Sequence, residues 1–315
     1  MNEREQQQIN DFFAQTDAEG ITNLEKAKSR QKVIRRIATM DKDKSYEAAG
    51  SEELDRTVPP GVVVEAGKLI GFGIHIFNED VYPLQSFEIY LRGCGLTGKL
   101  DLSGCQDLVF VDLYHNEISE ICISNLPALR ILGLQDNHIT MLNPTSMPAC
   151  QGIDVGKNRL RTLDVSQNPE LVELYVNDNS LTEIDLRHNP KLKYFYCHNN
   201  QIAELNTTAN PLLRHMDATG NPLRCIRSLA PQREAQLPLE LTAAEGGFVG
   251  LKFNPVYNAQ WKEAGEWQQS YYAYPEDGWQ FEGWYDENGM LLSMQAVWLD
   301  AYGESRRLFA RFKKA

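Results

Sequence analysis

The chain has 315 residues, of which 31 are Lys or Arg and 43 are Asp or Glu, so its net charge is −12 at pH 7. This length is enough for two or three domains. A net acidic chain without a concentrated basic stripe is a poor nucleic-acid binder, because contacts to phosphate dominate that affinity. No apolar run approaches the roughly 18 residues of a membrane span, and the N-terminus lacks the apolar core of a signal peptide. The sequence therefore predicts a soluble protein, cytoplasmic if this is the full native chain.

Residues 1–45 are predicted to form a helical N-terminal segment. Thr22 and Glu25 have the spacing of a capping box, in which each residue caps the backbone N–H of the other. Apolar residues give the following stretch a partly apolar helical face: Leu24, Ala27, Val33, Ile34, Ile37 and Ala38. Neighbouring Lys and Arg residues make the segment locally basic, which a solvated helix face explains better than a partner surface.

Residues 46–85 are predicted to be a linker followed by the N-terminal cap of a solenoid. Pro59-Pro60-Gly61 is typical of a linker or turn. Two short apolar runs follow at residues 62–64 and 69–70. We expect these runs to be strands that cover the first open end of the repeats that come next.

Residues 86–228 are predicted to be a repeat region. Asparagine returns there every 21 residues: Asn116, Asn137, Asn158, Asn179, Asn200 and Asn221. Apolar residues precede each asparagine at fixed offsets, as Leu132 and Leu134 precede Asn137. Such a period indicates a solenoid whose turns stack to bury one continuous core. The segment before each asparagine alternates like a strand, so stacked turns should align in a parallel sheet.

The six repeating asparagines are expected to be structural. An amide that points inward at a bend can satisfy backbone groups that would otherwise be buried unpaired. Cys94 takes the asparagine position of the first turn, at an interval of 22 residues instead of 21. We therefore expect a ladder of side-chain amides that begins after an irregular first turn.

The repeat region resembles the leucine-rich repeat. Residues 129–139, LRILGLQDNHI, match the pattern L-x-x-L-x-L-x-x-N-x-L. The short period resembles the internalin-like bacterial subclass. This resemblance implies an α+β fold, namely a leucine-rich-repeat solenoid with a parallel β-sheet on its concave face, an N-terminal helical cap and a small C-terminal β domain. It also implies a secreted or cell-surface protein, so the localisation stays open.

Residues 238–315 are predicted to form a separate antiparallel β domain, and all five tryptophans lie in them. Residues 273–284 read AYPEDGWQFEGW, and Asn288-Gly289 is a hairpin turn signal. The segment resembles the B-repeat, a small bacterial β domain, in its pattern A-x-P-x-x-G-aromatic-x-F-x-G-W. We expect Trp279 and Trp284 to form the core of this domain, with a carbohydrate-stacking platform as the alternative.

Signatures of catalysis and of metal binding are missing. The sequence has no nucleophile elbow, no phosphate loop and no H-E-x-x-H motif. Its six histidines do not cluster with carboxylates at metal-ligand spacing, and its six cysteines form no C-x-x-C pair. Cys150 and Cys197 stand at apolar repeat positions and are expected to be small buried hydrophobic side chains. The chain is therefore predicted to be non-enzymatic, with no metal and no cofactor.

Aromatic residues occupy outward positions of the predicted strands. One expected patch combines neighbouring turns: Tyr175, Tyr194, Tyr196 and His198. A second expected patch comes from earlier turns: Phe110, Tyr114 and Ile131. Aromatic side chains anchor protein interfaces, although tyrosine also suits strands without any binding role. The sequence thus predicts protein binding through the concave face, with a glycan or cell-wall ligand and a structural spacer as the alternatives.

Overall fold

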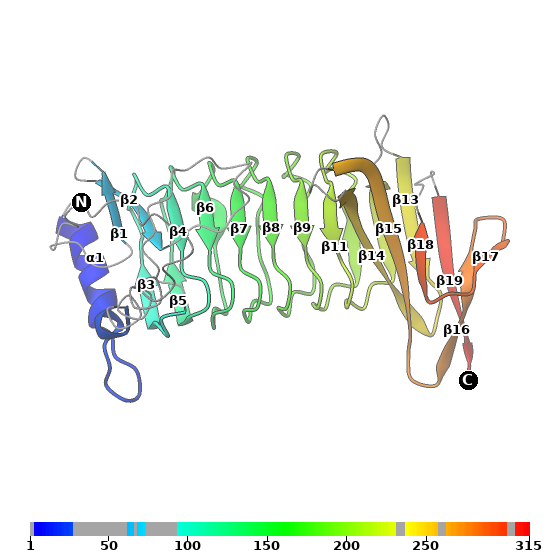
Figure 1. Cartoon of the computed structure of the whole chain (residues 1–315), viewed down its shortest axis with the longest axis horizontal. Coiled ribbons are helices and arrows are strands. Elements are labelled where there is room, and N and C mark those ends of the chain that lie inside the picture. The colour runs from blue at the N-terminus through cyan, green and yellow to red at the C-terminus, as the bar shows by residue number, and fades with distance from the viewer. Residues whose placement is uncertain are drawn as a thin grey trace, which may run out of the picture. The chain divides into compact units, whose positions relative to one another are not determined.

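The computed structural model describes residues 3–27, 62–65, 68–73, 93–230, 237–257, 263–300 and 306–315. The chain divides into two compact units, Met1–Asn158 and Arg159–Ala315. Each unit contains turns of a β-solenoid, and α1 in the first unit and the β strands at the end of the second agree with the predicted fold class (Figure 1).

The N-terminal segment contains two helical pieces. They are α1 (Glu3–Ala14) and a single turn of helix at residues 23–27. The apolar side of α1 is buried, with Phe12 1% and Phe13 3% exposed. Residues 28–61, which include the rest of the predicted helical segment and the linker, lie outside the described residues.

The predicted capping box is present at the start of the second helical piece. The backbone N–H of Thr22 donates to Glu25 Oε2 at 2.8 Å, and the N–H of Glu25 donates to Thr22 Oγ1 at 3.1 Å. The next residue, Asn23, donates to the carbonyl of Thr97 and accepts from the Thr97 N–H, both at 2.9 Å. Because Thr97 begins β3 (Thr97–Asp101), this segment covers an edge of the first repeat strand.

The two strands predicted at residues 62–64 and 69–70 are confirmed. β1 (Val62–Glu65) and β2 (Lys68–Gly73) form an antiparallel hairpin. β2 then pairs in parallel with β4 (Phe110–Asp112), where Phe72 lies opposite Val111. Residues 74–92, the last part of the predicted cap and the start of the predicted repeats, lie outside the described residues.

The repeats of the first unit form two short parallel sheets. One contains β4, β6 (Ile131–Gly133) and β7 (Gly152–Asp154), and the other contains β3 and β5 (Glu117–Cys122). In the first of these sheets Phe110 lies opposite Ile131, and Ile131 lies opposite Gly152, so each strand pairs with the strand 21 residues later. In the second sheet the pairing shifts by one residue between Gly98 and Lys99, beside the irregular 22-residue interval.

The repeats of the second unit continue the same pattern. On one side lie β8 (Glu173–Tyr175), β9 (Tyr194–Tyr196) and β11 (His215–Asp217), and on the other lie β10 (Glu204–Asn206) and β12 (Cys225–Ala230). The central residues Leu174, Phe195 and Met216 share one register and are all 0% exposed. The apolar strand positions therefore stack into a core, and the strands that carry them lie side by side (Figure 1).

The bend after each strand has a repeated backbone conformation. The residue just before each ladder asparagine has a positive φ: His115 59°, Asp136 59°, Lys157 50°, Asp178 54°, Asn199 56° and Gly220 67°. This left-handed conformation costs about 1–2 kcal/mol for a residue with a Cβ. The neighbouring turns must therefore supply the free energy that holds five non-glycine residues in it.

The C-terminal region continues the sheets of the last repeats. Its strands are β13 (Leu237–Ala243), β14 (Gly247–Tyr257), β15 (Glu263–Pro275), β16 (Trp279–Tyr285), β17 (Leu291–Ser293), β18 (Val297–Asp300) and β19 (Arg306–Lys314). β14 pairs with repeat strand β11, with Phe253 opposite Met216, and β13 pairs with repeat strand β12. Both sheets of the last repeats thus continue into this region. The pairs within this region are antiparallel except that of β13 with β19, which is parallel, and residue 238 lies inside the second compact unit.

Aromatic side chains form the core of this C-terminal region. Trp284 is 0% exposed, lies 6.1 Å from the ring of Tyr271 and 5.7 Å from that of Phe281, and donates through Nε1 to the carbonyl of Gln295 at 3.1 Å. Trp284 is therefore a core residue, as predicted. Trp279 is only half-buried, with Lys314 Nζ 5.8 Å from its ring centre.

The cysteines are all free thiols. Cys150 and Cys197 are each 0% exposed, as their repeat positions predicted. Burial raises the pKa of the Cys150 thiol to about 12, and burial likewise raises the pKa of the Cys197 thiol. Both therefore act as apolar packing groups and not as thiolate nucleophiles. Neither of the helical pieces described above has the length and apolar composition that a membrane crossing requires.

Candidate functional site

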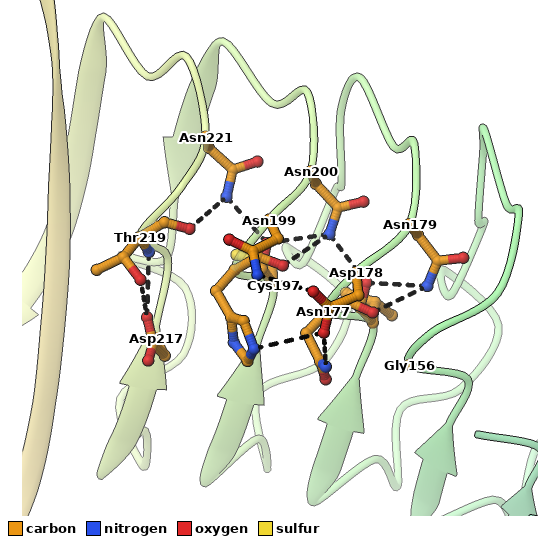
Figure 2. Close-up of polar contacts among 12 residues, drawn as sticks. Gly156, Asn177, Asp178, Asn179, Cys197, Asn199, Asn200, Asp217, Thr219 and Asn221 are labelled. Carbon is orange, nitrogen blue, oxygen red and sulfur yellow. Dashed lines mark hydrogen bonds and ion pairs between the residues drawn. The ribbon is translucent and has the colours of Figure 1, made fainter. Parts of the chain in front are cut away.

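The ladder asparagines link each turn to the one before it. Asn200 accepts from the N–H of Leu181 at 2.9 Å through Oδ1. Through Nδ2 it donates to the carbonyls of Val176 and Cys197 at 2.9 and 3.0 Å. Asn221 repeats this pattern one turn later (Figure 2). A single amide thus satisfies backbone groups of two adjacent turns.

The other predicted ladder positions have equivalent contacts. Oδ1 of Asn137 accepts from the N–H of Ile118 at 3.0 Å, and Nδ2 donates to two backbone carbonyls at 2.9 and 3.0 Å. The remaining members bond backbone groups in the same way: Asn116, Asn158 and Asn179. These amides hold the strands of each unit at fixed spacing, which fixes the positions of the outward side chains.

A second asparagine series lies on the opposite side of the second unit. Asn168, Asn189 and Asn210 are 0%, 0% and 1% exposed. Nδ2 of Asn189 donates to the carbonyls of Val165 and Asn168, both at 2.9 Å. This series was not predicted, although each of these asparagines precedes a proline at the same interval of 21 residues.

The second unit brings its four predicted aromatic residues together. Tyr175 and Tyr196 stack with ring centres 5.2 Å apart and planes at 20°. Tyr194 stacks on His215 at 4.4 Å and 18°, and His198 meets Tyr196 edge-on at 6.5 Å. We call these five residues the tyrosine face. Its three tyrosines and His198 are partly exposed, whereas His215 is 6% exposed.

Acidic and amide groups surround the tyrosine face. The hydroxyl of Tyr175 donates to Glu173 Oε2 at 3.4 Å, and Glu173 is fully buried. Asp178 accepts from Nδ2 of Asn177 and of Asn199, each at 2.7 Å, and lies 3.7 Å from His198 Nε2 (Figure 2). The rings therefore lie beside a fixed row of hydrogen-bonding groups.

An ion pair ties the neighbouring strand to this surface. Lys252 Nζ of β14 lies 2.7 Å from Oδ2 of Asp217, whose side chain is 8% exposed. Burial opposes ionisation of Asp217, but hydrogen bonds from Lys252 and Thr219 outweigh it and lower the pKa of the carboxyl. Burial, with a smaller effect of nearby Arg214, lowers the pKa of His215 to about 4, so this ring is neutral near pH 7.

The predicted patch of the first unit is only partly present. Phe110 is half-buried, and Tyr114 stacks with His115 at 6.0 Å and 29°. Ile131 is 1% exposed, so its prediction as a surface residue is wrong. All three residues of β6 are buried, and Ile131 lies in register with Phe110. Burying an isoleucine on this side removes apolar area from water, which is favourable by about 25 cal/mol per Å².

The comparisons with known proteins identify the repeats. Residues 169–214 match the family model of leucine-rich repeats in two copies. This chain contains leucine-rich repeats. No match is found among curated proteins.

Solved structures also resemble this chain, with 39 matching chains. One is a functional domain of InlJ from Listeria monocytogenes that includes a cysteine ladder. It is 16% identical with a TM-score of 0.34, and the match covers 67% of this chain and 47% of that chain. The match thus spans about half the length of that solved chain.

The leucine-rich-repeat register finds some site residues and misses others. His215 stands six positions before Asn221, at the offset of Tyr194 before Asn200, so periodicity could have included it. Lys252 lies outside the repeats. No repeat offset places it, because it reaches the repeat sheet through the pairing of β11 with β14.

Proposed function

We propose that this protein is a non-catalytic recognition module that binds a protein partner through the tyrosine face. This is the outer face of the repeat strands, and the resemblance to leucine-rich repeats implies that this face is concave. Leucine-rich repeats offer extended surfaces of this kind for recognition. The observation that carries the proposal is the stacking of partly exposed tyrosine rings, Tyr175 on Tyr196 and Tyr194 on the buried ring of His215.

Stacked rings suit this role for two reasons. Tyrosine offers a large apolar contact area together with a hydroxyl, and such residues are enriched at interface hot spots. Rings that already stack lose little conformational entropy when a partner binds, so less of the binding free energy is lost to ordering them.

A glycan is the second candidate ligand. The amides of Asn177 and Asn199 and the carboxylate of Asp178 lie beside the rings. Side chains of this kind could hydrogen-bond sugar hydroxyls while a tyrosine ring stacks on a sugar face. This alternative uses the same surface, so the test must separate the two ligand classes.

The test compares the wild type with the Tyr175→Ala/Tyr196→Ala variant. Affinity capture from bacterial and host lysates should recover a protein with the wild type and lose it with the variant. Tyr285→Ala serves as the control, because this tyrosine lies on β16, away from the repeat strands, beneath the guanidinium of Arg311. It should keep the captured protein.

An oligosaccharide array probed with the same three proteins separates the alternatives. Glycan binding that the double variant loses, without any captured protein, would replace the proposal with the second candidate. If neither assay distinguishes wild type from the double variant, the tyrosine face is not a recognition site and a structural role remains. Circular dichroism melting of each variant shows that it is folded.

A further inference from the structure

Exposed apolar side chains concentrate at one end of the second unit. Seven large apolar side chains are exposed within the described residues, and four of them lie within eight consecutive positions. These four are Met290 at 60%, Leu291 at 46%, Met294 at 73% and Val297 at 49% exposure. We call them the terminal patch. Scattered exposed apolar residues need no explanation, but a contiguous group of them marks an interaction surface.

The outer strands of both sheets of this unit lie at the terminal patch. β17 is the last strand of one sheet and pairs with β16, where Ser293 lies opposite Trp284. β18 is the last strand of the other and pairs with β15, where Val297 lies opposite Tyr272. Among the described residues neither strand has a neighbour on its other side. Each therefore presents an edge that can add another strand.

This edge lacks the usual protection against association. Natural edge strands carry charges or prolines that block pairing with other chains. Residues 289–298, GMLLSMQAVW, contain neither a charged residue nor a proline. The nearest charges on the hairpin are Asp286 and Glu287, which precede the patch in the turn. The protection that remains is the short length of the strands, three residues in β17 and four in β18, and one charged residue, Asp300, at the end of β18.

We propose that the terminal patch is a homodimer contact, in which the edge of one copy meets the same edge of a second copy. A two-fold contact brings a surface against itself, so it must be self-complementary. An uncharged apolar patch meets this requirement, whereas a patch with a net charge would repel its copy. The rest of this acidic chain, with a net charge of −12, is less suited to self-contact. Antiparallel strand pairing also has the two-fold symmetry that such a dimer needs.

The size of the patch predicts a reversible dimer. Stable interfaces bury about 800 Å² on each partner, and four side chains with two short strand edges provide only part of that area. The fraction of dimer should therefore rise with protein concentration and fall on dilution. The inference does not depend on the tyrosine face, which lies on other strands.

Sedimentation equilibrium over a wide concentration range tests the proposal. The wild type should show a monomer–dimer equilibrium. Leu291→Lys combined with Met294→Lys places like charges against one another across the two-fold axis, so it should raise the dimer dissociation constant about tenfold or more. The matched control is Leu212→Lys combined with Met141→Lys, since those side chains are 45% and 79% exposed elsewhere in the chain. It should dimerise like the wild type.

Hydrogen exchange locates the contact. Amides of residues 291–300 should exchange more slowly at high concentration in the wild type and in the control, but not in the Leu291→Lys/Met294→Lys variant. A wild type that is monomeric at every concentration overturns the proposal. A patch variant that dimerises as well as the wild type also overturns it, because another surface then forms the dimer.

Discussion

At the scale of single residues, side-chain amides bond the backbone groups that short strands leave without a partner. Each repeat strand in the sheet with the tyrosine face is three residues long. Such strands leave many backbone groups at the bends without a partner in the sheet. Asn200 satisfies three of these groups in two turns. A few side chains at fixed positions thus supply the hydrogen bonds of these buried backbone groups.

Replacing one ladder residue should therefore be costly. We expect Asn200→Ala to lower the free energy of unfolding by about 1–3 kcal/mol, because backbone groups of two turns lose their partner. The exposed neighbour Gln201 provides the control, and Gln201→Ala should change stability little. Urea unfolding measures both. Equal midpoints for the two variants would contradict a structural ladder.

His215 should make stability depend on pH. Its folded-state pKa of about 4 lies below the unfolded value near 6.5, because the ring is buried. Between these values the unfolded chain binds a proton that the folded chain does not bind. The free energy of unfolding should therefore fall as pH falls from about 6.5 to about 4, by up to roughly 3 kcal/mol. Below that range the loss stays constant.

Variants separate this effect from other acid effects. The difference in unfolding free energy between His215→Gln and the wild type should change across this pH range. Gln201→Ala, which alters an exposed side chain that does not titrate, should give a difference that is independent of pH. Urea unfolding at several pH values measures the differences. Parallel pH profiles for wild type and His215→Gln would show that His215 does not titrate abnormally.

At the scale of elements, the turns between strands place glycine against aromatic rings. Gly246 connects β13 to β14 with a φ of 94°, and a Cβ there would lie 2.2 Å from the Trp279 ring. Gly278 precedes β16 with a φ of 78°, and a Cβ there would have no heavy atom within 4 Å. Both glycines have a left-handed backbone conformation, but only Gly246 also lies close to a ring.

These two glycines form a matched pair for mutation. Gly278→Ala should cost about 1–2 kcal/mol for the backbone strain alone. Gly246→Ala should cost about 1–3 kcal/mol more, because the indole ring must shift. Thermal melting compares the two variants. Equal losses would mean that the Trp279 ring moves without cost.

Periodicity predicted the elements of the repeats but not their surroundings. The 21-residue interval placed the paired strands and the inward amides, because every turn meets the same neighbours. It failed at Ile131, where an outward position is buried. Strand alternation tells which side a residue faces, but not what covers that side. The pairing of β14 with β11 was missed for a related reason: the change in composition near residue 238 suggested a boundary, although hydrogen bonds continue across it.

At the scale of the whole second unit, the C-terminal strands complete the repeats. Met216 is 0% exposed in the structure, and β14 pairs along the strand that contains it. Lys252 of β14 also pairs with the nearly buried carboxylate of Asp217. Without β14 the last repeat would leave an apolar strand edge and a buried charge unpaired, which is costly.

Truncation should therefore prevent the second unit from folding. We expect a chain that ends at residue 230 to lose the cooperative unfolding of residues 159–230. Native-state hydrogen exchange of the repeat amides, compared with the full chain, measures this. Full protection of amides 173–217 in the truncated chain would instead support an independent C-terminal domain, as the sequence first suggested.

The constant interval between paired strands has a consequence for how such a chain changes in length. In β8, β9 and β11 every strand position pairs with the position 21 residues later, so gaining or losing one whole turn there keeps each pairing and each amide contact intact. Insertion of a single residue would instead shift the strand pairing. The 22-residue first interval is accompanied by a shift in strand pairing between Gly98 and Lys99, at the end where there is no earlier repeat strand in the described residues to misalign. The length of such a repeat array can therefore change during evolution in steps of one turn, about 4.8 Å each.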